Sequence, residues 1–257
     1  MILLELLSIV QHPYIVEFQK ERSDKMAKKR YDEWYFYDSI SKFIDEIDFT
    51  YNTYINNIKN IFDTPEKEAN KYIKYLKINQ KELYSFYPDD VESEIQGKGQ
   101  ERYYFVMNMK YRNLAIFINL VYQMLEQFFV SFCKFQQKYH SYDKNIKNEK
   151  FRRLDQCANI FKKYFNLDIK QFKHYNKIDE LRLLQNVLKH SDGESKEKLL
   201  NIRPDYFIEN KSVFTLYKNT IIDPTLNIID NDLKEYIYSI KEFLRQFPDK
   251  ITHEYFC

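Results

Sequence analysis

The chain has 257 residues, and its formal net charge of +2 favours no class of charged partner. Only three glycines and six prolines occur, and so few turn-forming residues exclude a β-sandwich or a Rossmann sheet and predict an all-α bundle of long helices. The three cysteines, Cys133, Cys157 and Cys257, lie far apart without metal-ligand spacing, so neither a disulfide framework nor a zinc site is indicated.

The N-terminal region is predicted to consist of amphipathic helices. A first helix extends to about residue 23, with an interruption at Pro13. Apolar residues at helical spacing predict a long helix over residues 31–62, and the charged stretch before it is either a turn or a continuation of this helix. Thr64 as N-cap and Pro65 in the first turn predict a further helix that runs towards Tyr84.

Residues 87–100 hold two of the three glycines and several acidic residues, a composition that predicts a mobile loop. This loop is the predicted boundary between an N-terminal helical region, residues 1–99, and a C-terminal helical bundle, residues 100–257. The alternative is that both form one continuous domain.

The C-terminal region begins with the most apolar predicted helix, from Arg102 to about His140. Its run from Leu114 to Phe132 contains polar side chains such as Glu126, so we expect a buried core helix rather than a membrane span. Further elements follow in chain order: helices over residues 152–165, 178–190 and 230–247, a short helical piece at 169–172, a left-handed cap at Gly193, and a strand or hairpin candidate at 213–222.

The segment from Lys134 to Lys177 is locally basic, with twelve Lys and Arg residues against four Asp and Glu residues. Aromatic residues are interleaved with these charges. Such a surface can hold phosphates and stack on unpaired bases of a nucleic acid. The alternative interpretation is a solvated helix face above ordinary core aromatics, and the sequence leaves both open.

The predicted helix that ends at His190 carries the most informative pattern. Arg182, Asn186 and His190 are spaced i, i+4 and i+8, so they lie along one face, apart from an apolar stripe. His exchanges protons near neutral pH, Arg offsets the charge of a phosphate, and Asn orients a hydroxyl. This set suits metal-free RNA cleavage by attack of a ribose 2′-hydroxyl. The alternative is structural, because helix ends favour His and Lys electrostatically.

In this hypothesis His190 is the general acid or base, Arg182 or a nearby Lys steadies the phosphate, and Asn186 orients the substrate. No metal or other cofactor is expected. Ser195 follows His190 closely in the sequence and could reach the same cleft, but we expect it to cap a helix. Five further cations are candidates for substrate binding: Lys189, Arg203, Lys198, Arg152 and Arg153.

The stretch Leu181–His190 resembles the last core helix of HEPN domains, and Leu120–Val130 resembles the Tyr- and Glu-bearing helix of several groups in that family. The resemblance covers about residues 100–207. It implies a helical bundle, metal-independent endoribonuclease activity, an active site at a homodimer interface, and a role in bacterial stress response or defence against phage. An antitoxin or a defence protein is the implied partner.

This sequence departs from the family pattern at one position. Gln185 stands where the family has its Arg, four intervening residues before His190, and Arg182 lies one turn earlier. A neutral amide cannot offset phosphate charge as Arg does. The second hypothesis is therefore a non-catalytic helical module that docks on a partner effector or a nucleic acid.

The apolar N-terminus lacks the basic start and cleavage site of a signal peptide, so a cytoplasmic location without membrane association is expected.

Overall fold

The computed structural model describes residues 25–62, 64–80, 85–139, 150–190, 193–207 and 226–247. Within these ranges the regular elements are helices and no strand occurs, so the predicted all-α class is confirmed. The first predicted helix, before residue 24, and the strand or hairpin candidate at 213–222 lie outside the described residues.

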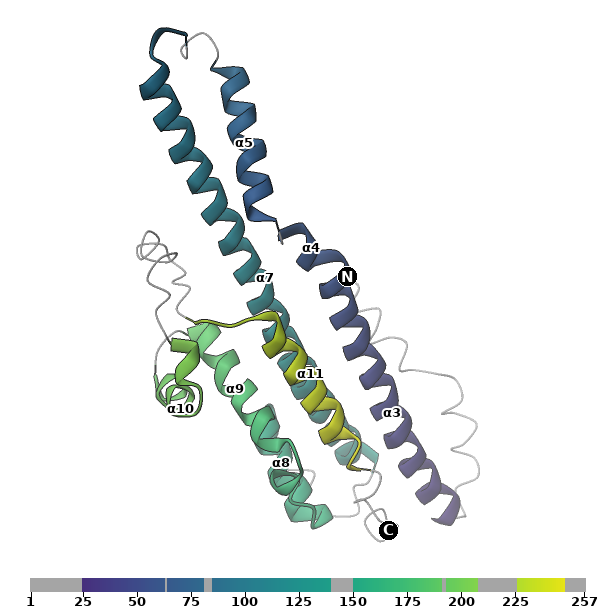
Figure 1. The fold of residues 1–257 in the computed structure, drawn as a ribbon. Coiled ribbons are helices and arrows are strands. Elements are labelled where there is room, and N and C mark those ends of the chain that lie inside the picture. Colours follow the sequence, from purple (N-terminus) through teal and green to yellow (C-terminus); the bar gives the residue numbers. More distant parts are fainter. Residues whose placement is uncertain are drawn as a thin grey trace.

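The longest element is α7 (Pro88–Tyr139), whose 52 residues span roughly 78 Å at the rise of an α-helix. In Figure 1, α7 runs along the whole molecule, with α5 (Pro65–Asn79) beside its N-terminal part. The remaining helices that contact α7 gather around its C-terminal part: α3 (Lys25–Thr53), α4 (Lys59–Phe62), α8 (Leu154–Phe165), α9 (Tyr175–His190) and α11 (Asp230–Leu244).

Short helical turns complete the fold. A π-helical turn, Tyr54–Ile58, joins α3 to α4, so the long helix predicted over residues 31–62 is confirmed, with an earlier start at Lys25. The predicted piece near residue 169 is a 3₁₀ turn, Ile169–Gln171. After α9, the helix α10 (Glu194–Ile202) and a 3₁₀ turn, Pro204–Phe207, lie beside the C-terminal end of α9.

Aromatic rings fill the core where these helices meet. Phe247, after α11, has its ring centroid 5.6 Å from that of Phe129 on α7 and 5.7 Å from that of Phe161 on α8. It also lies 5.6 Å from Phe36 on α3 and 4.9 Å from Phe172 before α9. The edge-to-face and tilted arrangements are the ones that aromatic pairs prefer. This one cluster therefore fixes α9 relative to α3, α7, α8 and α11.

The mobile loop predicted over residues 87–100 is wrong, because these residues form the first turns of α7. Pro88 occupies the first helical position, where its missing N–H is no loss, and Asp89 and Asp90 complement the helix dipole. Gly99 permits close packing on α5, because a Cβ there would lie 2.5 Å from the Ile73 Cγ1 and Cδ1 atoms. The predicted boundary after residue 99 falls inside α7.

Two predicted caps differ in detail. Thr64 precedes α5 as expected, but its side chain makes no capping hydrogen bond. Gly193 has the expected positive φ, +105°, yet it precedes α10 and does not close α9 as a left-handed cap. At α11, Asp232 accepts a hydrogen bond from the Ile229 N–H at 2.8 Å, so this carboxylate helps to cap the start of the helix.

One helix of the described residues, Pro88–Phe135 within α7, is long and apolar enough to cross a membrane by length and composition. Buried helices of soluble proteins have the same composition. In this fold Leu114, Ile118, Val121 and Leu125 of that helix are buried in the common core, as predicted for a core helix. The cytoplasmic location stays a prediction.

Candidate functional site

The N-terminal part of α9 is anchored by a buried ion-pair network. Glu180 of α9 accepts a hydrogen bond from Arg203 Nη1 at 2.8 Å, and Arg203 Nη2 lies 3.0 Å from Asp232 of α11. The side chains are largely buried: Arg203 is 18% exposed, Glu180 is 12% exposed and Asp232 is 6% exposed. The network thus holds α9, α11 and the segment after α10 together.

Two tyrosines complete this network. The Tyr236 hydroxyl donates to Glu180 at 2.8 Å, and the Tyr206 hydroxyl donates to Asp232 at 2.8 Å. Burial raises the pKa of both hydroxyls above the ordinary value for tyrosine. The guanidinium of Arg203 also lies over the Tyr206 ring, 3.7 Å from its centroid. Every charge here has a partner, which is the condition for burying charges without a large penalty.

Arg203 is therefore placed differently from the role expected of it. Burial alone would lower its pKa, but hydrogen bonds to Asp205, Glu180 and Asp232 raise the pKa above the ordinary value for arginine. Asp205, in turn, has a lowered pKa because Arg203 hydrogen-bonds to it. With its guanidinium bonded to three carboxylates, Arg203 supports the fold around α9.

The candidate face of α9 carries Arg182, Asn186 and His190. Arg182 Nε donates to Asp179 at 2.7 Å, and its side chain is 32% exposed. Because Asp179 lies one turn towards the N-terminus, this bond directs the guanidinium away from His190. Arg182 and His190 are also separated by about 12 Å along the helix axis. One chain therefore does not bring these two side chains to a single phosphate group.

The other two members of the face differ in exposure, since Asn186 is half-buried and His190 is exposed. Asn186 Nδ2 donates to the Ser195 hydroxyl at 3.4 Å, a contact that links α9 to α10. Ser195 thus meets Asn186 rather than capping a helix, and Gly193 occupies the cap position. His190 is exposed as the last residue of α9, next to the exposed Lys189. Gln185, at the position of the family's Arg, is 4% exposed and faces the core.

The helix that resembles the Tyr- and Glu-bearing HEPN helix lies against the same region. Glu126 accepts hydrogen bonds from the Tyr122 hydroxyl and from the Leu154 N–H, both at 3.3 Å. It therefore satisfies one of the unpaired amides at the start of α8. Burial, followed by the charge of Glu126, raises the pKa of Tyr122, and the charge of Arg182 opposes this shift. Tyr122 is thus near Arg182.

The remaining cation candidates fall into three environments. Lys198 pairs with Glu194 at 2.5 Å on the exposed side of α10, and this hydrogen bond lowers the pKa of Glu194. Arg153 pairs with Asp155 at 3.2 Å at the start of α8. Arg152 is exposed and lines a cavity between α7 and the segment that precedes α8. The structure therefore does not gather the predicted cations into one cluster.

Sequence reasoning missed the Glu180, Asp232, Tyr206 and Tyr236 side chains that position α9. Their separations along the chain, such as 23 residues between Glu180 and Arg203, carry no local periodicity. It also missed Lys134 and Lys150 as individual site residues. The local excess of basic residues between Lys134 and Lys177 was the signal that could have found them.

Comparison of the chain with models of known protein families, with curated proteins and with solved structures finds no match. The resemblance to HEPN domains thus stands on the residues of the two helices described above.

Proposed function

We propose that this chain is a HEPN-like RNA-binding protein that acts in stress response or in defence against phage. The observation that carries the proposal is the accessible C-terminal end of α9, where Lys189 and His190 are exposed beside the face that bears Arg182 and Asn186. A cation and an imidazole at this end can contact the phosphates of an RNA strand. The proposed setting is the cytoplasm, and no cofactor takes part.

The first form of the proposal is metal-independent cleavage in a homodimer. His190 would take the proton of the ribose 2′-hydroxyl as this oxygen bonds to the neighbouring phosphorus. The P–O5′ bond would break and the leaving 5′-oxygen would receive the proton, while Asn186 would orient the strand. Since Arg182 of the same chain points away from His190, a second copy of the motif would supply the cation that offsets the phosphate charge. A two-fold contact between the α9 faces meets this requirement.

The second candidate is a non-catalytic module that docks on RNA or on a partner effector. Two observations favour it. Gln185 is buried where the family's Arg is expected, and the Arg182 guanidinium is already neutralised by Asp179. RNA is then held by the surface without cleavage.

One experiment separates the two. Purified protein, His190→Ala and Asn186→Ala are incubated with transfer RNA in the presence of a chelator, and both binding and cleavage are followed. Cleavage by wild type that is lost in His190→Ala supports the nuclease. Binding without cleavage in all three supports the module. Absence of both binding and cleavage in wild type contradicts the proposal as a whole.

A further inference from the structure

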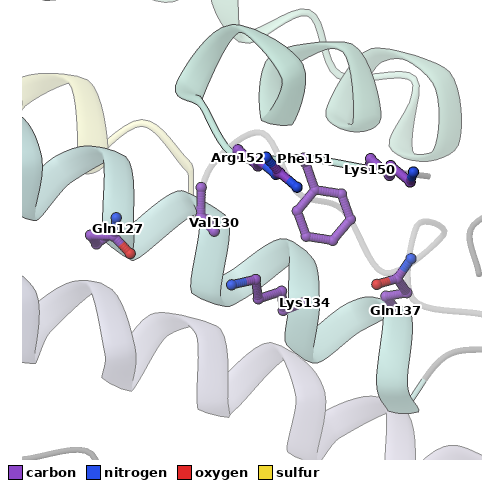
Figure 2. A pocket seen from close by; sticks show the side chains of 7 residues that line it. All are labelled: Gln127, Val130, Lys134, Gln137, Lys150, Phe151 and Arg152. Carbon is purple, nitrogen blue, oxygen red and sulfur yellow. The ribbon is translucent and has the colours of Figure 1, made fainter. Parts of the chain in front are cut away.

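A cavity of about 380 Å³ lies between α7 and the segment that leads into α8, away from the candidate face of α9. Gln127, Val130, Lys134 and Gln137 line it from α7. Lys150, Phe151 and Arg152 line it from the opposite side, as Figure 2 shows. Its size falls in the range of small-molecule sites, about 300–1,000 Å³.

The charged side chains that line the cavity are all positive. Lys134, Lys150 and Arg152 contribute three positive charges, and no acidic residue lines the cavity within the described part of the chain. Among the residues that the structure describes, none of these three cations has a carboxylate partner within ion-pair distance. Among the described acidic residues close in sequence to the lining, Asp155 pairs with Arg153, and Glu126 accepts hydrogen bonds from Tyr122 and the Leu154 N–H. Several positive side chains around one cavity favour the binding of a phosphate group.

The uncharged lining residues can contact a ligand that is larger than an inorganic anion. Phe151 is buried and its ring projects towards α7, and Val130 of α7 adds a second apolar side chain to the lining. Gln127 and Gln137 bring amide groups, each of which can donate and accept hydrogen bonds. Such a combination matches a phosphate joined to a flat, polar-edged base or to a ribose.

The cavity is also separate from the α9 face. Along α7 the lining runs from Gln127 to Gln137, and Tyr122, which neighbours Arg182, precedes them by about 8 to 22 Å along the helix axis. No residue of the cavity lining belongs to α9.

We propose that this cavity binds the phosphate group of a nucleotide, either free or within a single-stranded RNA. The cations hold the phosphate oxygens, the amides contact the ribose or the base edge, and Phe151 and Val130 support the apolar surface of the ligand. The site does not require that the α9 face binds or cleaves RNA.

The test is calorimetric titration of the full chain with adenosine monophosphate, with inorganic phosphate and with a short single-stranded RNA. Lys134→Glu and Arg152→Glu reverse charges in the cavity. Lys170→Glu is the matched control, because Lys170 is exposed on the 3₁₀ turn before α9 and does not line the cavity. Circular dichroism verifies that each variant is folded.

Adenosine monophosphate binding that weakens about tenfold or more in each cavity variant, but not in Lys170→Glu, supports the proposal with a free nucleotide as the ligand. The same pattern for the RNA alone supports it with a strand as the source. Equal binding of inorganic phosphate and nucleotide, with no effect of Gln127→Ala, overturns the nucleotide assignment. Unchanged affinities in both cavity variants overturn the site.

His190→Ala separates this outcome from the proposed function. It leaves mononucleotide binding unchanged if the cavity is the site. Loss of RNA cleavage in His190→Ala therefore says nothing against the cavity, and loss of nucleotide binding in Lys134→Glu says nothing against the α9 face.

Discussion

At the scale of single residues, Arg203 has the largest structural role that the fold reveals. It is the shared partner of Glu180 and Asp232, both almost fully buried. Surface ion pairs contribute little to stability, but removing one partner of a buried pair leaves an uncompensated charge in the interior. The stability of the α9 region therefore depends on this guanidinium more than on an exposed cation such as Arg153.

Arg203→Met is accordingly expected to lower the free energy of unfolding by about 3–5 kcal/mol. Arg153→Met is the matched control, because the Arg153–Asp155 pair is exposed and its loss costs at most about 1 kcal/mol. Urea denaturation followed by circular dichroism measures both. A loss in Arg203→Met no greater than in the control would show that the network is not what holds α9 in place.

A second residue, Tyr175, makes the free energy of unfolding fall as the pH rises through the alkaline range. Burial, with the charge of Asp179, raises the pKa of Tyr175 to about 12, whereas the pKa of a tyrosine in the unfolded chain is about 10. Between these values the unfolded chain loses the proton and the folded chain keeps it, so folding becomes less favourable as pH rises. Tyr175→Phe lacks this proton and is expected to gain stability relative to wild type on going from pH 9 to pH 11. Urea midpoints at the two pH values measure the difference, and an equal wild-type-to-variant gap at both would refute it.

At the scale of elements, the contact of α5 with the N-terminal part of α7 is set by one glycine. The Gly99 position has no room for a side chain against Ile73, whereas nothing lies within 4 Å of a Cβ at Gly97. Leu76, Val91 and Ile95 form a small core of their own beside this contact. The paired helices are thus held by a modest apolar cluster and a close backbone approach.

This difference gives a matched pair of variants. Gly97→Ala is expected to stabilise the protein by about 0.5–1 kcal/mol, because alanine favours the helix. Gly99→Ala gains the same propensity but displaces Ile73, so it should be less stable than Gly97→Ala, with faster amide hydrogen exchange in α5. Equal stabilities and equal exchange in the two variants would contradict the close approach.

The glycines also show what sequence reasoning could reach. Helical periodicity predicted the long helix over residues 31–62, the apolar core helix and α9, because burying an apolar stripe dictates local spacing. Gly97 and Gly99 were misread as loop residues. The tertiary role of Gly99 depends on Ile73 in another helix, and Gly97 lies on the same helix with nothing within 4 Å of a Cβ. The Glu180–Arg203–Asp232 network and the lining of the cavity escaped prediction for the same reason: each unites residues from separate segments.

At the scale of the whole molecule, the aromatic core fixes α9 against α3, α7, α8 and α11, so the candidate face and the cavity stand on one rigid framework. The sequence located the α9 face correctly on a helix, but it could not show that the Arg182 guanidinium turns towards Asp179. Two separate cationic regions along α7 and α9 favour contact with an extended, phosphate-bearing ligand.

The most direct test of RNA binding is fluorescence anisotropy of the full chain with a labelled single-stranded RNA across a series of salt concentrations. We predict saturable binding whose logarithmic association constant falls linearly with the logarithm of salt concentration, with a slope of about −2 for three phosphates contacted. Binding that is absent at low salt, or that does not change with salt, would contradict the account.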